Sequence, residues 1–164
     1  MKAKEQVYEY LREQGIAFEV AEHSAVFTIE EMDALNFGAE NSSVVVKNLF
    51  LRDAKGKRHF LVVLQKDKQA NLSALQQELG CTKLSFASED RLQRLLGLTK
   101  GSVSPLGVLS DADQQVELAI DRDLIEQGRV GVHPNDNTAT VFLSFEDLKQ
   151  LIIRRGNPIH FIKI

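Results

Sequence analysis

The chain has a single cysteine, Cys81, among its 164 residues. One cysteine excludes an internal disulfide framework and any zinc site built from several cysteines. The thiol could act as a nucleophile, but "LGCTKLSF" reads as the start of a strand, so we expect Cys81 to be a small buried apolar residue. His59 and His160 have no metal-ligand spacing to each other or to Cys81. We therefore expect neither a metal nor another cofactor.

Long hydrophobic runs are also missing. The longest apolar stretches, such as "LVVL" at 61–64, have the length of a strand and are too short to span a bilayer. The N-terminal "MKAKEQVYEYLREQG" is charged and has the pattern of a helix, without the apolar core of a signal peptide. These absences predict a cytoplasmic protein with no membrane partner.

The chain has no excess of positive charge. Its 20 Lys and Arg residues face 23 Asp and Glu residues, for a formal net charge of −3. A protein that coats nucleic acid broadly is normally basic, so we expect no DNA partner. A local basic mouth is still compatible with an acidic chain. Its candidate side chains are Lys47, Lys66, Lys68, Arg91, Arg94 and Lys100.

No repeat, linker or low-complexity run divides the chain, which predicts one domain over residues 1–164. Helix-start signals occur at Thr28 with Glu31, at Asn71, at Ser88, and at Ser144 with Asp147. Periodicity and these signals predict about five helices, at 2–14, 28–38, 72–80, 89–97 and 145–156.

Seven or eight strands are predicted between and after these helices, without strict βαβ alternation. The fold class is therefore α+β, with a mixed, mainly antiparallel sheet and helices packed against it. The strand segments are 16–23, 42–53, 57–67, 82–87, 116–121, 129–134, 138–143 and 158–164.

The stretch "KGSVSPLGVL" at 100–109 reads as a long loop that is rich in backbone and poor in side chains. It lacks the "GK[ST]" ending of a phosphate-binding loop. It also lacks the "GxSxG" elbow, so neither Ser102 nor Ser104 is predicted to be a nucleophile. By elimination, chemistry here would use positioning, backbone amides and one lysine.

Lys47 is the most informative charged residue, because it stands between "VVV" and "NLFL" in a strand that otherwise looks buried. It could snorkel to water or discourage pairing at a sheet edge. Alternatively, it could aim a cation at a phosphate or an oxyanion in a pocket. His133 in "GVHPND" allows two similar interpretations, a turn histidine bonded to nearby backbone or a pocket wall that contacts substrate. His23 could pack or hydrogen-bond before the second helix.

Three segments occur in an order and at a spacing that resemble a known family. They are "VVKNLFLRD" with Lys47, the G-x-x-x-P pattern of Gly101–Pro105, and the late "GVHPNDNTATV". Together they resemble the prolyl-tRNA synthetase editing-domain family, also called YbaK-like. The phrases "KNLFL", "LSFAS" and "GSVSPLG" are most similar to its free-standing alanyl-tRNA(Pro) deacylases. The resemblance covers nearly the whole chain.

The resemblance implies a trans-editing hydrolase whose second site admits alanine and excludes proline. Its catalytic residues would be Lys47, which holds the terminal adenosine and its phosphate, and Gly101. The loop would shape the acyl pocket and offer backbone N–H groups, and the free 2′-hydroxyl of the tRNA would assist an oriented water. The implied substrate-binding residues are Asn48, Ser102, Val103, Ser104, Pro105, Val132 and His133, while Leu49 and Phe50 could set the pocket size.

Strand alternation constrains this assignment. Lys47 and Leu49 share one side of their strand, and Asn48 and Phe50 share the other. They cannot line one wall unless the strand bulges or the pocket wraps an edge.

The implied partner is the acceptor end of tRNA(Pro) carrying a mischarged amino acid. The acidic net charge suggests that the synthetase acts as a further partner. Three alternatives stay open. The acyl group could be cysteine, serine or threonine; the protein could be a non-catalytic module that binds tRNA ends or the synthetase; or Lys47 could snorkel beside a mere connector.

Overall fold

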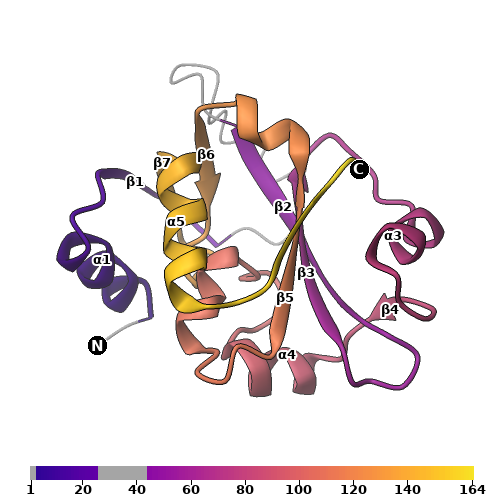
Figure 1. Cartoon of the computed structure of the whole chain (residues 1–164). Coiled ribbons are helices and arrows are strands. Elements are labelled where there is room, and N and C mark those ends of the chain that lie inside the picture. Colours follow the sequence, from indigo (N-terminus) through magenta and orange to yellow (C-terminus); the bar gives the residue numbers. More distant parts are fainter. Residues whose placement is uncertain (1–2, 26–43) are drawn as a thin grey trace.

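The computed structural model describes residues 3–25 and 44–164 (Figure 1). The predicted helix at 28–38, with its capping box of Thr28 and Glu31, lies outside the described residues. Within the described ranges, no helix is long and apolar enough to cross a membrane.

The helices begin where their capping residues predict. Asn71, Ser88 and Ser144 each accept a hydrogen bond from the backbone N–H three residues later, which satisfies one free donor of each first turn. The N-terminal helix buries Val7 and Leu11, as its periodicity requires. The α-helices of the described residues are α1 (Ala3–Glu13), α3 (Leu72–Leu79), α4 (Glu89–Leu96) and α5 (Phe145–Arg155). The described residues also form two 3-10 helices that the sequence analysis does not predict, η1 (Pro105–Ser110) and η2 (Arg122–Glu126).

The sheet confirms the predicted α+β class. Its order is β1-β7-β6-β2-β3-β5-β8, and β4 pairs with β2 beside this path. Four pairs of strands are antiparallel, and β2–β6, β3–β5 and β5–β8 are parallel, so the sheet is mixed. The strands are β1 (Phe18–Glu22), β2 (Val44–Arg52), β3 (His59–Gln65), β4 (Ser85–Phe86), β5 (Val116–Asp121), β6 (Arg129–Val132), β7 (Ala139–Ser144) and β8 (Ile159–Ile162).

The strand predicted at 82–87 is shorter than expected, since only Ser85 and Phe86 pair with β2. The neighbouring backbone groups are used elsewhere. Gln76 Oε1 accepts from Leu84 N, and the cap of α4 at Ser88 already turns the chain.

Two hydrophobic clusters cover opposite faces of β2 and β3. The larger cluster includes Leu11 of α1, Leu96 of α4, Leu106 of η1 and Leu148 of α5. The smaller cluster lies under α3, where Leu75 and Leu79 meet β3. In Figure 1, α1 and α5 accordingly stand on one side of the view and α3 on the other.

The stretch 100–109 is only partly a loop. Ser104 caps η1, and Pro105 occupies its first turn, where a missing N–H costs nothing. A Cβ on Gly107 would lie 2.8 Å from Leu98 Cδ1, so this glycine is explained by packing between η1 and the chain after α4. Backbone available to a ligand is thus confined to the part of the stretch before Pro105.

Candidate functional site

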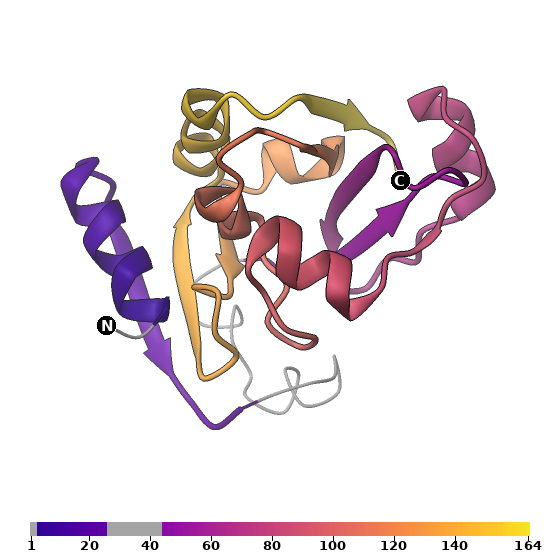
Figure 2. The same cartoon turned by 90° about the horizontal axis from the view of Figure 1, so that it is seen from below.

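The strands β2 and β6 form a fork. They pair in parallel only at Val44–Val130 and Val45–Gly131, and β2 then continues against β3. The segment that leads from α4 to η1 lies between the two diverging pairs of strands, which Figure 2 shows from below. The fork therefore gives the loop a backbone edge on each side.

Side-chain hydrogen bonds tie the loop to both arms of the fork. Asn48 Nδ2 of β2 donates to Val103 O at 3.2 Å. Ser104 Oγ donates to His133 O at 2.5 Å, just after β6. Asn135 Nδ2 donates to Leu106 O at 3.2 Å. The three segments that carry the family resemblance are thus in direct contact.

The loop residues take different roles. Gly101 has φ +92°, in the left-handed region that favours glycine. Ser102 is buried, and its N–H donates to Thr99 O at 3.0 Å. Val103 packs partly buried against the larger cluster. Ser104 is fully buried, and its Oγ also accepts from Leu106 N at 3.1 Å. With both bonds made, the Ser104 hydroxyl has a structural role.

Two asparagine oxygens at the fork accept no hydrogen bond from the described residues. Asn48 Oδ1 and Asn135 Oδ1 are buried and accept no hydrogen bond within the part of the chain that the structure describes. Their amide nitrogens face carbonyl oxygens, which fixes the orientation of both groups. Buried acceptors are normally satisfied, so a donor from outside the described residues would complete both groups. The sequence alone did not single out Asn135.

His133 supplies a third acceptor. Its Nδ1 lies 3.1 Å from Ala139 O, and because a carbonyl can only accept, Nδ1 carries the proton. Burial lowers the pKa of His133, against the opposite effect of this bond, so the neutral imidazole is favoured and Nε2 keeps its lone pair. The histidine is half-buried, in keeping with a site wall.

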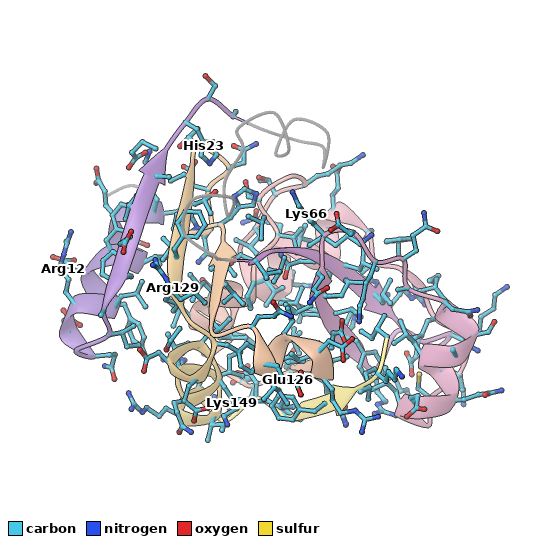
Figure 3. All side chains as sticks on the ribbon, turned by 90° about the horizontal axis from the view of Figure 1, so that it is seen from above. Arg12, His23, Lys66, Glu126, Arg129 and Lys149 are labelled. Atoms are coloured by element: carbon cyan, nitrogen blue, oxygen red, sulfur yellow. The ribbon has the colours of Figure 1, made fainter. Side chains whose placement is uncertain are left out.

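His23 lies beside His133 and is itself held by hydrogen bonds. Its ring centroid is 6.5 Å from that of His133. Its Nδ1 lies 2.8 Å from Ser24 O, and its Nε2 lies 3.0 Å from Thr140 Oγ1. Figure 3 shows His23 at the end of β1, beside β7. Both ring nitrogens of His23 are therefore used in holding the structure.

Lys47 lies on the other face of β2. Its cross-strand partner is Leu64, in the cluster under α3, whereas the partner of Asn48 is Val63, in the larger cluster. The Lys47 side chain is half-buried. The structure therefore does not bring Lys47 and the loop together on one face of the strand. Val132 also differs from a pocket wall, since it is 2% exposed and packs in the larger cluster.

The edge of β2 connects the two faces. Phe50 O accepts from Ala87 N at 2.9 Å, so the backbone groups of Phe50 point away from β3. Those of Asn48, two residues earlier, point the same way. No described strand pairs with β2 on this side between Val46 and Leu49. A ligand at this edge would have Asn48 on one side and Lys47 on the other.

Other candidate sites are less developed. A cavity of about 310 Å³ lies between β1, β7, the start of α5 and Arg129 of β6. Cys81 is half-buried against the smaller cluster, so it is less enclosed than predicted. Burial raises the pKa of its thiol, which keeps it protonated and weakly nucleophilic. The described residues contain no group of three or more His, Cys, Asp or Glu side chains that could hold a metal ion.

Comparison with known proteins identifies the family. Residues 23–151 match the aminoacyl-tRNA editing domain, and the chain belongs to this family. It is 51% identical over 164 residues to the prolyl-tRNA editing protein ProX of Acetoanaerobium sticklandii, covering 100% of this chain and 99% of that protein. The family resemblance drawn from the three segments is thereby confirmed.

More distant relatives also match over most of the length of this chain. The prolyl-tRNA synthetase associated domain-containing protein 1 of Mus musculus is 37% identical over 147 residues, covering 87% of this chain and 85% of that protein. A solved structure described as a candidate trans-editing enzyme for prolyl tRNA synthetase superposes with a TM-score of 0.73 at 21% identity. It covers 100% of this chain and 98% of that one, and this likeness supports the fold.

Proposed function

We propose that the protein is a trans-editing deacylase, a single-domain enzyme that hydrolyses alanine from mischarged Ala-tRNA(Pro). The observation that carries the proposal is the meeting of three family segments at the fork, where buried acceptors lack partners among the described residues. The 51% identity to a prolyl-tRNA editing protein supports tRNA(Pro) as the substrate carrier.

The loop would act through its backbone. An aminoacyl ester is already activated, so its hydrolysis needs an oriented water and stabilisation of the oxyanion more than a covalent nucleophile. The hydroxyl of Ser104 is occupied by His133 O and Leu106 N, which agrees with a mechanism that uses no serine. Backbone N–H groups of the loop at Gly101, other than that of Ser102, which donates to Thr99 O, would bind the ester carbonyl oxygen.

The unpaired acceptors suit the α-ammonium group of the amino acid. An ammonium presents three donors and accepts nothing. Asn48 Oδ1, Asn135 Oδ1 and the Nε2 of neutral His133 are three acceptors on the segments joined at the fork. We infer that they bind this ammonium and so orient the ester toward the loop.

Lys47 would bind the nucleotide rather than the acyl group. It lies across from Asn48 at the edge of β2 that no described strand pairs with between Val46 and Leu49, so the 3′ end of the tRNA would wrap this edge. Lys47 would then hold the phosphate of the terminal adenosine while the amino acid enters the fork. The substrate's 2′-hydroxyl would assist the attacking water.

Selectivity would follow from size. A synthetase site built for proline discriminates poorly against alanine, because a smaller side chain costs only about 10–200-fold in selection. A second site that excludes proline supplies the rest. The enzyme would work in the cytoplasm with translation, and the net charge of −3 favours a hand-off of the tRNA from the synthetase.

The test is deacylation of Ala-, Cys-, Ser- and Pro-tRNA(Pro) by the wild type, Lys47→Ala and the exposed control Lys163→Ala. Loss of alanine with proline spared, reduced more than about 100-fold by Lys47→Ala and unchanged by Lys163→Ala, is the expected result. Hydrolysis of a different aminoacyl-tRNA(Pro) would assign the enzyme another acyl specificity. Absence of turnover with every substrate would overturn the deacylase and leave a module that binds tRNA ends.

A further inference from the structure

Two guanidinium groups converge on the β2–β3 hairpin turn. Arg52 Nε donates to Asp53 O at 3.1 Å, and its Nη2 donates to Ala54 O at 3.0 Å. Arg91 of α4 donates through Nη1 to Gly56 O at 3.2 Å. A Cβ on Gly56 would stand 2.8 Å from Arg91 Nη2 and 3.1 Å from Arg52 Nη2, so these two nitrogens are at most 5.9 Å apart.

No carboxylate of the described residues balances this pair. Arg58 of the same hairpin is bound by Glu117 at 2.9 Å, whereas neither Arg52 nor Arg91 has a salt bridge within the described residues. The buried Asp53 accepts backbone N–H groups of the turn instead. Two adjacent guanidiniums without a carboxylate are typical of a site that awaits an anion.

The surroundings are mainly cationic. Around the pair lie four more cations, two carboxylates in the first turn of α4 and the buried carboxylate of Asp53 in the turn itself. The cations are Arg94, Lys55, Lys57 and Lys83, and the carboxylates of α4 are Glu89 and Asp90, all exposed. Burial together with Arg91, Arg94 and Arg52 lowers the pKa of His59, whose Nε2 lies 3.0 Å from Arg91 Nη1. Local charge is therefore positive on a chain whose net charge is negative.

This basic patch, consisting of Arg52, Arg91 and Arg94, is continuous with the fork. Arg52 is on the same face of β2 as Asn48, four residues or about 13 Å along the strand. The helix that carries Arg91 and Arg94 leads directly into the loop at Gly101.

We propose that Arg52, Arg91 and Arg94 bind the phosphodiester backbone of the tRNA acceptor arm, next to the acylated nucleotide at the fork. Planar guanidiniums recognise phosphate oxygens through paired N–H donors. The choice of tRNA as the polyanion rests on the proposed function. This local site would let an acidic protein bind its substrate without a basic surface over the whole molecule.

The experiment measures binding of uncharged tRNA(Pro) as a function of salt. The variants are the double substitution Arg52→Gln/Arg91→Gln and the single substitution Arg94→Gln. The matched control is Arg12→Gln on α1, an exposed arginine on the far flank from α3 (Figure 3). The double variant should bind about 10-fold more weakly at about 100 mM salt, and each lost contact should reduce the salt slope by about 0.7–0.9.

Arg94→Gln guards against a folding artefact, because this exposed side chain has no hydrogen bond or ion pair with described residues. The difference in binding between wild type and variants should disappear with the alanyl ester of adenosine, because this small ester has no phosphate that could reach the patch. Salt slopes equal to that of Arg12→Gln would overturn the proposal. So would equal damage toward the small ester, which would indicate a distorted fork.

The two proposals fail separately. Arginine-dependent tRNA binding without hydrolysis of any aminoacyl-tRNA would overturn the deacylase and leave the phosphate site standing. Hydrolysis of Ala-tRNA(Pro) with unchanged salt slopes would do the reverse.

Discussion

The start and the end of β2 differ in the kind of polar group that they present. At its start, the strand meets β6 and the loop through neutral amides and hydroxyls, with buried acceptors unpaired among the described residues and Lys47 on the opposite face. At its end, the hairpin gathers two guanidiniums on backbone carbonyls, without carboxylate partners in the described ranges. Under the proposed function, one strand carries a neutral site for the amino acid at its start and a cationic site for the nucleic acid chain at its end.

Replacing Gly101 with valine should have the largest effect. The residue has φ +92°, a conformation that is strained for a β-branched side chain, and the loop would lose its open backbone. We expect deacylation of Ala-tRNA(Pro) to fall more than about 100-fold, as measured in single-turnover assays. Gly15→Val is the matched control, because Gly15 has φ +70° and a Cβ added there would meet nothing within 4 Å. Equal loss of activity in both variants would contradict a local role for the loop.

Ser104→Ala tests the link across the fork. The substitution leaves His133 O and Leu106 N without their partner in a fully buried place. We expect the free energy of unfolding to fall by about 1–3 kcal/mol, as measured by urea denaturation. The comparison is Ser88→Ala, which removes an exposed helix cap alone and should cost about 1 kcal/mol. A cost no greater than that of Ser88→Ala would show that the fork does not depend on this bond.

Gly56→Ala sharpens the other end of the comparison. A Cβ would meet Arg91 Nη2 at 2.8 Å and push the guanidiniums apart, while the φ of +67° adds strain of about 1 kcal/mol. We expect weaker tRNA binding in the salt titration. Gly80→Ala has a similar φ of +63° with nothing within 4 Å, so it should lose stability but keep tRNA affinity. Equal tRNA affinity in the two variants would count against the patch.

Cys81→Ser should have the smallest effect. The thiol is half-buried at the margin of the smaller cluster, and its raised pKa keeps it protonated. We expect a change in the free energy of unfolding within about 0.5 kcal/mol and unaltered deacylation. A loss of activity above about ten-fold would indicate that the thiol acts as a nucleophile.

Much of the fold could be predicted because its signals are local. Asn71, Ser88 and Ser144 start their helices with their own side chains, so each start signal lies within four residues of sequence. Strand alternation likewise predicts opposite faces for Lys47 and Asn48, and their cross-strand partners confirm this separation. The 3-10 helix at Pro105–Ser110 could not be distinguished from open loop, since the same small residues and proline suit both conformations.

The sequence by itself determined the family, the fold class and most of the described α-helices and strands, because capping, periodicity and ordered motifs act over short stretches of chain. Only the tertiary structure decided which residues meet. Asn48 reaches Val103 across 55 positions, Ser104 reaches His133 across 29, and Arg52 and Arg91 share a turn although one lies on a strand and the other on a helix. Such contacts depend on how the sheet divides at the fork and how α4 packs over it, and packing is a property of the whole chain.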